Sequence, residues 1–405
     1  MSLKPEILYI AHRIPYPPNK GDKIRSFNEI KYLSKKFIVD LVCLADDPAD
    51  MKFTGQLKKY CRRVVVFRLK PIMGKIKGLF SLLKGKSISE GYFFHLGMAV
   101  NIEKWLEKYP YKAVICFSSP MAVYLDSTRV KKSGTLRCVM DFCDLDSDKW
   151  LQYARKMGGV LGLLYRLESY RLLKLEKKIN QSFHASVFVS QKEQLLFKKV
   201  YSKARNLVTI PNGVDVDFFS PGPDDCLKDP PKKGSVLMFA GVMDYYANVE
   251  GVLWFCQRIF PLIKKQIPDV CLVIAGSRPV SAIQRLDKRD DIQVTGYVRD
   301  IRPWYGRADV CIVPLRIARG VQNKVLEAMA MAKPVVSTPE ALQGICCLSG
   351  HHLVSADNPG AFAQAVVDLL KNPAHASELG QRAREFVHKE YNWNRCLKPL
   401  ERIIS

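Results

Sequence analysis

The stretch RGVQNKVLEAMAMAKPVVST, residues 319–338, has residue types and spacing that suit an anion-binding helix start. Gly320 permits a sharp turn, and Asn323 suits a position near a helix cap. The free N–H groups and partial positive charge of a helix N-terminus attract phosphate oxygens. Lys324, in the first turn, is unfavourable for the helix dipole by about 0.3–1 kcal/mol unless an anion lies nearby. The pattern therefore predicts a phosphate partner.

Two more residues of this stretch carry groups that can contact a ligand. Arg319 can add a bidentate phosphate contact. Glu327 lies one helical turn after Asn323, and its carboxylate can accept hydrogen bonds from hydroxyl groups. From the spacing alone, a solvated Lys324 and a capped, structural Glu327 remain an open alternative.

A second candidate site is the proline-rich loop PYPPNKGDKIRS, residues 15–26, which follows a strand that ends near His12. Gly21 would let backbone N–H groups approach a ligand, with Lys20 and Arg25 near its negative charge. The alternative is an ordinary loop with solvated basic side chains, and a structural role for His12 is equally open.

A third candidate site is CVMDFCDLDSDKWLQYA, residues 138–154, just past a strand end. Ligands of open α/β sheets gather at the carboxyl ends of strands. Asp144 or Asp146 could therefore accept hydrogen bonds from hydroxyl groups of a ligand. The nearness of four acids could suggest a metal, but such loops are usually caps and solvated turns.

Short apolar runs alternate with helical patterns along the chain, and this predicts parallel sheets covered by helices. The expected strands are residues 6–12, 37–45, 63–69, 113–118, 137–142 and 185–190, then 235–241, 270–277, 291–298, 309–315 and 333–338. A chain of 405 residues exceeds one ordinary core. We expect an N-terminal domain over residues 1–219, a second over 220–385, and a C-terminal helix over 386–405 that packs back on the first.

The formal charge of +24 indicates an anionic partner, such as a membrane surface, nucleic acid or a phosphorylated ligand. We expect no nucleic acid, because no RNA- or DNA-binding motif stands out. Twelve cysteines without a CxxC motif favour a reduced, cytoplasmic protein. The N-terminal apolar run is too short for a signal peptide, and no run suits a membrane-spanning helix, so any membrane contact should be peripheral.

Residues 70–86 have the pattern of a helix that lies in a membrane interface. Apolar residues recur at helical spacing beside Lys75, Lys77, Lys84 and Lys86. Such a helix buries its apolar face at the acyl boundary while its lysines meet anionic head groups. The alternative is a helix that packs its apolar stripe on the first domain. Residues 156–178 form a second candidate of this kind.

Motifs in both halves resemble retaining glycosyltransferases of the GT-B fold, in family 4. They include NGVDVDFFSP (212–221), LMFAGVMDYYANVEGVLWF (237–255), LVIAGS (272–277) and the stretch at 319–338. Residues 7–37 and 140–154 look more closely like the exopolysaccharide sugar transferases of exosortase (PEP-CTERM) systems. The resemblance implies an α/β protein with two Rossmann-like domains, whose parallel sheets face each other across a cleft.

The resemblance further implies transfer of a sugar, with retention of configuration, from a nucleotide-sugar to a lipid-linked saccharide acceptor in exopolysaccharide biosynthesis. No metal or cofactor is implied, and the location would be the inner face of the plasma membrane. Lys324, Glu327 and Asp144 are the catalytic candidates. His12, Lys20, Arg25 and Asp146 would face the acceptor or sugar. The candidates for donor binding are Gly21, Gly241, Arg278, Tyr297, Val298, Arg319, Gly320, Val321, Gln322 and Asn323.

The chain departs from the family pattern at three places. Arg319 replaces the usual glutamate, Met243 and Asp244 replace a common Arg/Lys pair, and Ala332 replaces a glycine. These changes keep alternatives open: a soluble acceptor, a sugar-nucleotide epimerase, or a catalytically silent module that binds nucleotide-sugars.

Overall fold

The computed structural model describes residues 4–126, 136–222, 234–318 and 320–405. The chain forms two compact units: Met1–Pro211 with Leu397–Ser405, here unit 1, and Asn212–Cys396, here unit 2. The boundary therefore precedes the one expected at residue 220, and only the last part of the segment 386–405 joins unit 1. Arg319 lies outside the described residues.

Unit 1 is built on one parallel sheet of seven strands in the order β3-β2-β1-β4-β5-β6-β7. Most of its strands are buried apolar runs, as expected when helices cover both faces of a sheet. The strands are β1 (Glu6–Ala11), β2 (Ile38–Ala45), β3 (Arg63–Arg68), β4 (Ala113–Phe117), β5 (Arg137–Cys143), β6 (Ala185–Phe188) and β7 (Leu207–Thr209).

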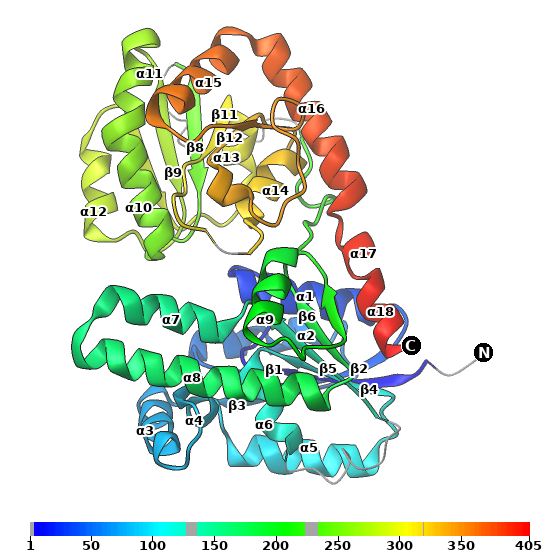
Figure 1. Ribbon diagram of the computed structural model, residues 1–405. Coiled ribbons are helices and arrows are strands. Elements are labelled where there is room, and N and C mark those ends of the chain that lie inside the picture. The colour runs from blue at the N-terminus through cyan, green and yellow to red at the C-terminus, as the bar shows by residue number, and fades with distance from the viewer. Residues whose placement is uncertain (1–3, 127–135, 223–233, 319) are drawn as a thin grey trace. The chain divides into compact units, whose positions relative to one another are not determined.

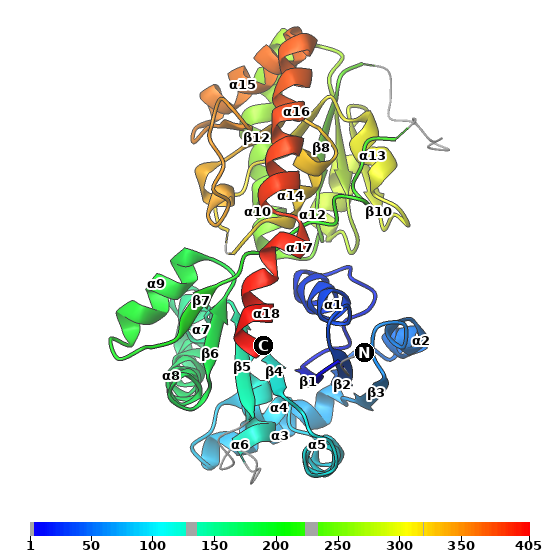
Figure 2. The same cartoon turned by 90° about the vertical axis from the view of Figure 1, so that its right-hand side faces the viewer.

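Helices lie on both faces of this sheet (Figures 1 and 2). They are α1 (Gly21–Leu33), α2 (Thr54–Leu57), α3 (Pro71–Leu83), α4 (Ile88–Tyr92), α5 (Leu96–Lys108), α6 (Val123–Asp126), α7 (Asp146–Met157), α8 (Gly159–Ser182), α9 (Gln191–Val200) and α18 (Lys398–Ile404). The last helix is bound to unit 1 through Glu401, which accepts hydrogen bonds from Tyr32 Oη at 2.5 Å and Lys36 Nζ at 2.6 Å.

Unit 2 has a parallel sheet of six strands in the order β10-β9-β8-β11-β12-β13. These are β8 (Val236–Ala240), β9 (Cys271–Ala275), β10 (Ile292–Gly296), β11 (Val310–Val313), β12 (Val335–Ser337) and β13 (Val354–Ser355). The helices are α10 (Tyr246–Trp254), α11 (Phe260–Gln266), α12 (Ser281–Gln284), α13 (Arg302–Arg307), α14 (Asn323–Ala330), α15 (Pro359–Lys371), α16 (Pro373–Glu390) and α17 (Trp393–Cys396).

The sequence-based strands agree with the structure. All eleven expected apolar runs contain strands, whereas β7 and β13 were not expected because they have only three and two residues. The C-terminal helix breaks near Tyr391, as expected. Within the described ranges, no helix is both long and apolar enough to cross a membrane.

The strand orders locate the ligand-binding edges of both sheets. In each unit, chain order reverses beside the first strand: β1 neighbours β4 in unit 1, and β8 neighbours β11 in unit 2. In open α/β sheets, ligands bind beyond the carboxyl ends of the strands at such a reversal. These edges are therefore where candidate residues should gather.

Candidate functional site

Helix α14 begins at the reversal edge of unit 2, in the chain segment that follows β11. Gly320 supplies the turn before it with a φ of 58°, in the left-handed region that suits glycine. Gln322 occupies the N-cap position, and no side chain caps the helix there. The first N–H groups of a helix have no partner within the helix, so this end offers donors to an anion.

Lys324 points its ammonium group at the loop after β8. Its Nζ donates to Asn248 Oδ1 at 2.5 Å and lies 4.4 Å from the ring centroid of Phe239. Burial lowers the pKa of Lys324 to about 7, although the charge of Glu327 acts in the opposite direction. In the described part of the chain, no carboxylate forms an ion pair with Lys324. The lysine therefore has a neutral partner and gains charge readily when an anion arrives.

Glycines bring the neighbouring loops together at this edge. A Cβ on Gly241 would lie 3.0 Å from Lys324 Nζ and 2.8 Å from Asn248 Nδ2. A Cβ on Gly276 would lie 1.6 Å from the carbonyl oxygen of Gly241, so only glycine fits there. Gly276 N also donates to Gly296 O at 3.2 Å. The ends of β8, β9 and β10 thus form one continuous backbone surface beside Lys324.

Glu327 lies one turn further along α14 and is oriented by a buried tyrosine. Tyr305 Oη donates to Glu327 Oε2 at 3.1 Å. Burial raises the pKa of Glu327, while the Tyr305 hydrogen bond and the charge of Lys324 act to lower it. The second carboxylate oxygen is thus the one that a ligand hydroxyl can use.

The other unit 2 candidates occupy the same edge. Tyr297 is exposed and Val298 is half-buried, directly after β10. Arg278 follows β9 with a φ of 57°, and its Nη1 lies 3.6 Å from Asp244 Oδ2. Val321 is buried, so it can contribute only backbone groups.

Two residues of this site were not recognised in the sequence. An asparagine between a strand and a helix is typical of a turn or cap, but Asn248 lies within the first turn of α10, and its Nδ2 donates to Val242 O at 2.8 Å. That bond fixes which side of the amide faces Lys324. Nothing in the sequence indicated that Tyr305 contacts Glu327, because an isolated tyrosine in a helix is usually a core residue.

In unit 1, His12 lies at the end of β1 beside Asp22, the second residue of α1. His12 Nε2 is 3.3 Å from Asp22 Oδ2, and its ring stacks on Phe117 with centroids 5.8 Å apart. Burial raises the pKa of Asp22, but the hydrogen bond from His12 and the nearby Arg13 outweigh it and lower the pKa overall. Asp22 is therefore held ionised at the reversal edge of this sheet.

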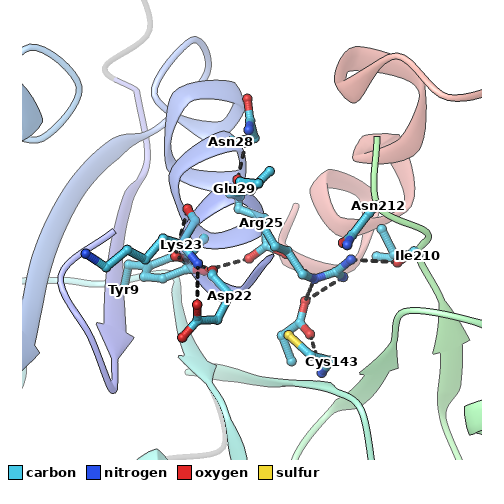
Figure 3. Close-up of polar contacts among 12 residues, drawn as sticks. Tyr9, Asp22, Lys23, Arg25, Asn28, Glu29, Cys143, Ile210 and Asn212 are labelled. Atoms are coloured by element: carbon cyan, nitrogen blue, oxygen red, sulfur yellow. Dashed lines mark hydrogen bonds and ion pairs between the residues drawn. The ribbon is translucent and has the colours of Figure 1, made fainter. Parts of the chain in front are cut away.

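Arg25 does not face a ligand, in contrast to the sequence-based expectation. It is 1% exposed, and its Nη2 and Nε donate to Asp141 Oδ2 at 2.7 and 2.9 Å (Figure 3). Its Nη1 donates to Ile210 O at 2.8 Å, and Glu29 lies 3.1 Å from Nε. Arg25 is therefore a buried structural cation that ties α1 to β5.

The two residues at the start of α1 lie nearer the surface. Lys20 is the half-buried N-cap residue, and its side chain makes no capping hydrogen bond. Gly21 is exposed, and a Cβ there would meet no atom within 4 Å. The protein fold itself therefore does not require glycine at this position, which leaves approach of a ligand as a reason for it.

The acidic loop after β5 is held by two buried glutamates. Glu193 Oε2 accepts from Leu145 N at 2.8 Å, and Glu176 Oε1 accepts from Ser147 N at 3.0 Å. Asp146 Oδ2 accepts from Ser119 Oγ at 3.1 Å, so Asp146 helps to join α7 to the end of β4. Asp144 is half-buried beside them.

Helix α3 exposes its large apolar residues instead of packing them on unit 1. Ile72 is 75% exposed and Leu83 is 83% exposed. The buried face of α3 is small: Gly74 lies against the Tyr92 ring and Gly78 against Ile88, where a Cβ would come within 2.9 Å of each. The alternative of an apolar stripe packed on the domain is therefore wrong.

Comparisons with known proteins identify glycosyltransferases among the proteins that this chain resembles. Residues 234–372 match the family of group 1 glycosyl transferases. The chain is 24% identical to an uncharacterised 44.6 kDa protein in the cps region of Klebsiella pneumoniae, over 98% of each chain. It is also 24% identical to the GDP-mannose-dependent alpha-(1-6)-phosphatidylinositol monomannoside mannosyltransferase of Mycolicibacterium smegmatis, over 56% of this chain and 64% of that protein.

Solved structures share the fold. Sucrose-phosphate synthase of Thermosynechococcus elongatus superposes with a TM-score of 0.73 at 19% identity, over 98% of each chain. HepE of Anabaena, in complex with UDP, gives 0.66 at 14% identity, again over 98% of each chain. The expected pair of parallel-sheet α/β domains of the GT-B type is thereby confirmed.

Proposed function

We propose that this protein, a glycosyltransferase whose residues 234–372 match the group 1 glycosyl transferases, transfers a sugar from a nucleotide-sugar to a lipid-linked saccharide, with retention of configuration. The observation that carries the proposal is the position of Lys324 Nζ, 3.0 Å from where a Cβ on Gly241 would lie. A diphosphate bound against Gly241 would contact both the Lys324 ammonium group and the backbone N–H groups at the start of α14.

The donor side of the proposal follows from the charge that develops during the reaction. When the bond from sugar to diphosphate breaks, negative charge grows on the leaving phosphate oxygens. Preorganised N–H groups and a cation stabilise that charge more than they stabilise the intact donor. Lys324 and the start of α14 would do this, and we expect transfer to persist in a metal chelator. Glu327 would accept hydrogen bonds from the ribose.

The names of similar proteins indicate which donors to try first. HepE has been crystallised with UDP and with UDP-glucose, and the mannosyltransferase of M. smegmatis depends on GDP-mannose. We infer a nucleoside diphosphate sugar with uracil or guanine as its base. Tyr297 and Val298 would lie beside the base, and Arg278 beside the nucleotide.

Unit 1 would bind the acceptor. His12 and Asp22 meet at the end of β1, and Asp144 follows β5 in the same sheet. We propose that Asp144 and the His12–Asp22 pair bond hydroxyl groups of the acceptor or of the transferred sugar. Lys20 and the exposed amide of Gly21 would meet negative charge on the same substrates.

We further propose that α3 holds the enzyme on the inner face of an anionic membrane, where a lipid-linked acceptor resides. The support is that α3 exposes its large apolar residues Ile72, Ile76 and Leu79 and buries its glycines, the opposite of what a helix that packs on a domain core does. Exposed lysines 75, 77, 84 and 86 would meet lipid head groups, each adding about 1 kcal/mol.

A thermal-shift screen against UDP-, GDP-, ADP- and dTDP-sugars tests the donor. A ligand that binds the native state raises the apparent melting temperature. Sugar transfer from the donor so identified is then measured, and the product's anomeric configuration is read by proton NMR. No shift with any of the four nucleotides would refute the proposal, and an inverted product would refute retention.

Vesicle flotation tests the role of α3. Changing lysines 75, 77, 84 and 86 to glutamate should abolish binding to vesicles of phosphatidylglycerol and phosphatidylethanolamine. Lysines 198, 199, 265 and 288 are exposed on other helices and provide a control with the same change in charge. If both variants lose binding equally, overall charge rather than α3 is responsible.

A further inference from the structure

The hairpin of α7 and α8 ends in an exposed apolar tip. Gly158 and Gly159 form the turn with φ values of 59° and 54°. Directly after them, Val160 is 85% exposed and Leu163 is 66% exposed, and Met157 before them is exposed as well. Figure 1 shows the hairpin reaching beyond the sheet of unit 1, and Figure 2 views α8 almost along its axis.

The packing within the hairpin does not use these tip residues. The two helices approach closely at Gly162, where a Cβ would lie 3.1 Å from Ala154 O. Behind the tip, the Trp150 ring meets the rings of Tyr153 and Tyr165 at centroid distances of 5.9 and 5.0 Å. The hairpin is thus held by its own inner face, and its tip is left apolar toward solvent.

The charges around the tip are of one sign. No acidic residue occurs between Asp148 and Glu168, whereas Arg155, Lys156 and Arg166 in that interval are exposed. The tip of the hairpin is apolar, cationic residues surround it, and tryptophan and tyrosine lie behind it. A segment that inserts into a membrane interface has the same order: apolar residues deepest, then aromatic residues and cations at the level of the head groups. A second copy of this chain fits less well, because like charges would meet.

The base of the hairpin is joined to the segment that carries α3. Glu168 of α8 accepts from the backbone N–H groups of Ile88 and Ser89 at 2.5 and 2.9 Å. Arg171 Nη1 donates to Gly85 O at 2.7 Å. These bonds fix α8 to the segment that runs from the end of α3 into the start of α4. The exposed stripe of α3 and the hairpin tip therefore belong to one rigid part of unit 1.

We propose that the α7–α8 tip inserts into an anionic bilayer and acts with α3 as a two-point membrane contact. The proposal extends the membrane contact proposed for α3 and does not depend on the identity of donor or acceptor. One interfacial helix alone leaves the protein free to rotate about that helix. A second, rigidly joined contact would fix which face of unit 1 meets the lipid surface.

The test is flotation of the full chain with vesicles of phosphatidylglycerol and phosphatidylethanolamine. Val160→Asp with Leu163→Asp should weaken vesicle binding about tenfold or more, because the variant loses two branched apolar side chains that the wild type transfers from water into the bilayer. Both positions are exposed, so folding should be unaffected. The control is Leu195→Asp with Leu348→Asp, which changes two exposed leucines elsewhere by the same charge.

Three results would overturn the proposal. The first is a hairpin variant that floats as well as the wild type, and the second is wild-type protein that binds phosphatidylcholine vesicles equally well. The third is a wild-type dimer, seen by sedimentation, that the variant no longer forms. Nucleotide-sugar binding is measured on the same samples. Loss of vesicle binding with donor binding intact supports the hairpin, whereas absent donor binding in the wild type refutes only the proposed transfer reaction.

Discussion

Arg25 in unit 1 and Lys324 in unit 2 are both basic residues near the start of a helix at the reversal edge of a parallel sheet. The sequence marked both as ligand contacts. Arg25 is buried with two carboxylates, Asp141 and Glu29, whereas Lys324 is held by the neutral amide of Asn248. The partner of a cation, rather than its place on a helix, therefore decides whether the cation is structural or free to bind an anion.

The pKa values express the same difference. Burial acts to lower the pKa of Arg25, but the charges of Asp141 and Glu29 outweigh it and raise that pKa, so the arginine stays charged. Burial lowers the pKa of Lys324 to about 7, with only partial compensation by Glu327. A diphosphate that binds here would therefore supply the anionic partner that Lys324 lacks, and would favour its charged form.

Arg25→Met should have the largest effect in this comparison. Removing one member of a buried ion pair leaves uncompensated carboxylates, and we expect the free energy of unfolding to fall by about 3–5 kcal/mol. Urea denaturation followed by circular dichroism measures this. Lys36→Met, which breaks an exposed pair with Glu401, is the control and should change stability by at most about 1 kcal/mol. If Arg25→Met kept its stability and lost only sugar transfer, Arg25 would be a substrate-binding residue and not a structural one.

Lys324→Met should reverse that pattern, with stability retained and donor binding lost. A buried charge contact to the diphosphate is worth about 2–5 kcal/mol of binding free energy. Calorimetric titration with the preferred nucleotide-sugar measures it, and Lys288→Met, an exposed lysine of the same unit, is the control. Unchanged affinity in Lys324→Met would exclude Lys324 from the donor site.

Asn248→Asp should make the Lys324 site resemble the Arg25 site. The new carboxylate would pair with Lys324 and repel the diphosphate, so we expect donor affinity to fall by about 1.5–3 kcal/mol. Asn248→Ser, which keeps a neutral oxygen at this position, is the matched control. Equal losses in the two variants would show that the shape of Asn248, rather than its neutrality, matters.

The pH dependence of donor binding should be the smallest of these effects. Lys324 is charged below a pH of about 7 and neutral above it, and the phosphates of a nucleotide-sugar are ionised throughout this range. Affinity should therefore fall as pH rises, by at most about tenfold for each pH unit. Calorimetry across this range measures the slope. The slope should vanish in Lys324→Met, and a slope that persists there would have another origin.

Much of the fold was predictable because local patterns determine it. Apolar runs bounded by turn residues predicted the buried strands, and the run at 319–338 predicted the start of a helix. Short strands such as β13, with two residues, gave no such pattern. Unit 2 begins at Asn212, eight residues before the start expected at residue 220.

Local patterns along the chain were sufficient to predict two parallel α/β sheets, a helix start suited to phosphate, and an apolar, lysine-rich segment at residues 70–86. They could not predict which basic residues are paired, because the partners lie far apart in the chain: Arg25 and Asp141 are 116 residues apart, and Lys324 and Asn248 are 76 apart. Nor could they predict that α3 buries its glycines and exposes Ile72 and Leu83, which depends on tertiary packing. A helical pattern fixes which residues share a face, but the neighbouring elements determine which face is covered.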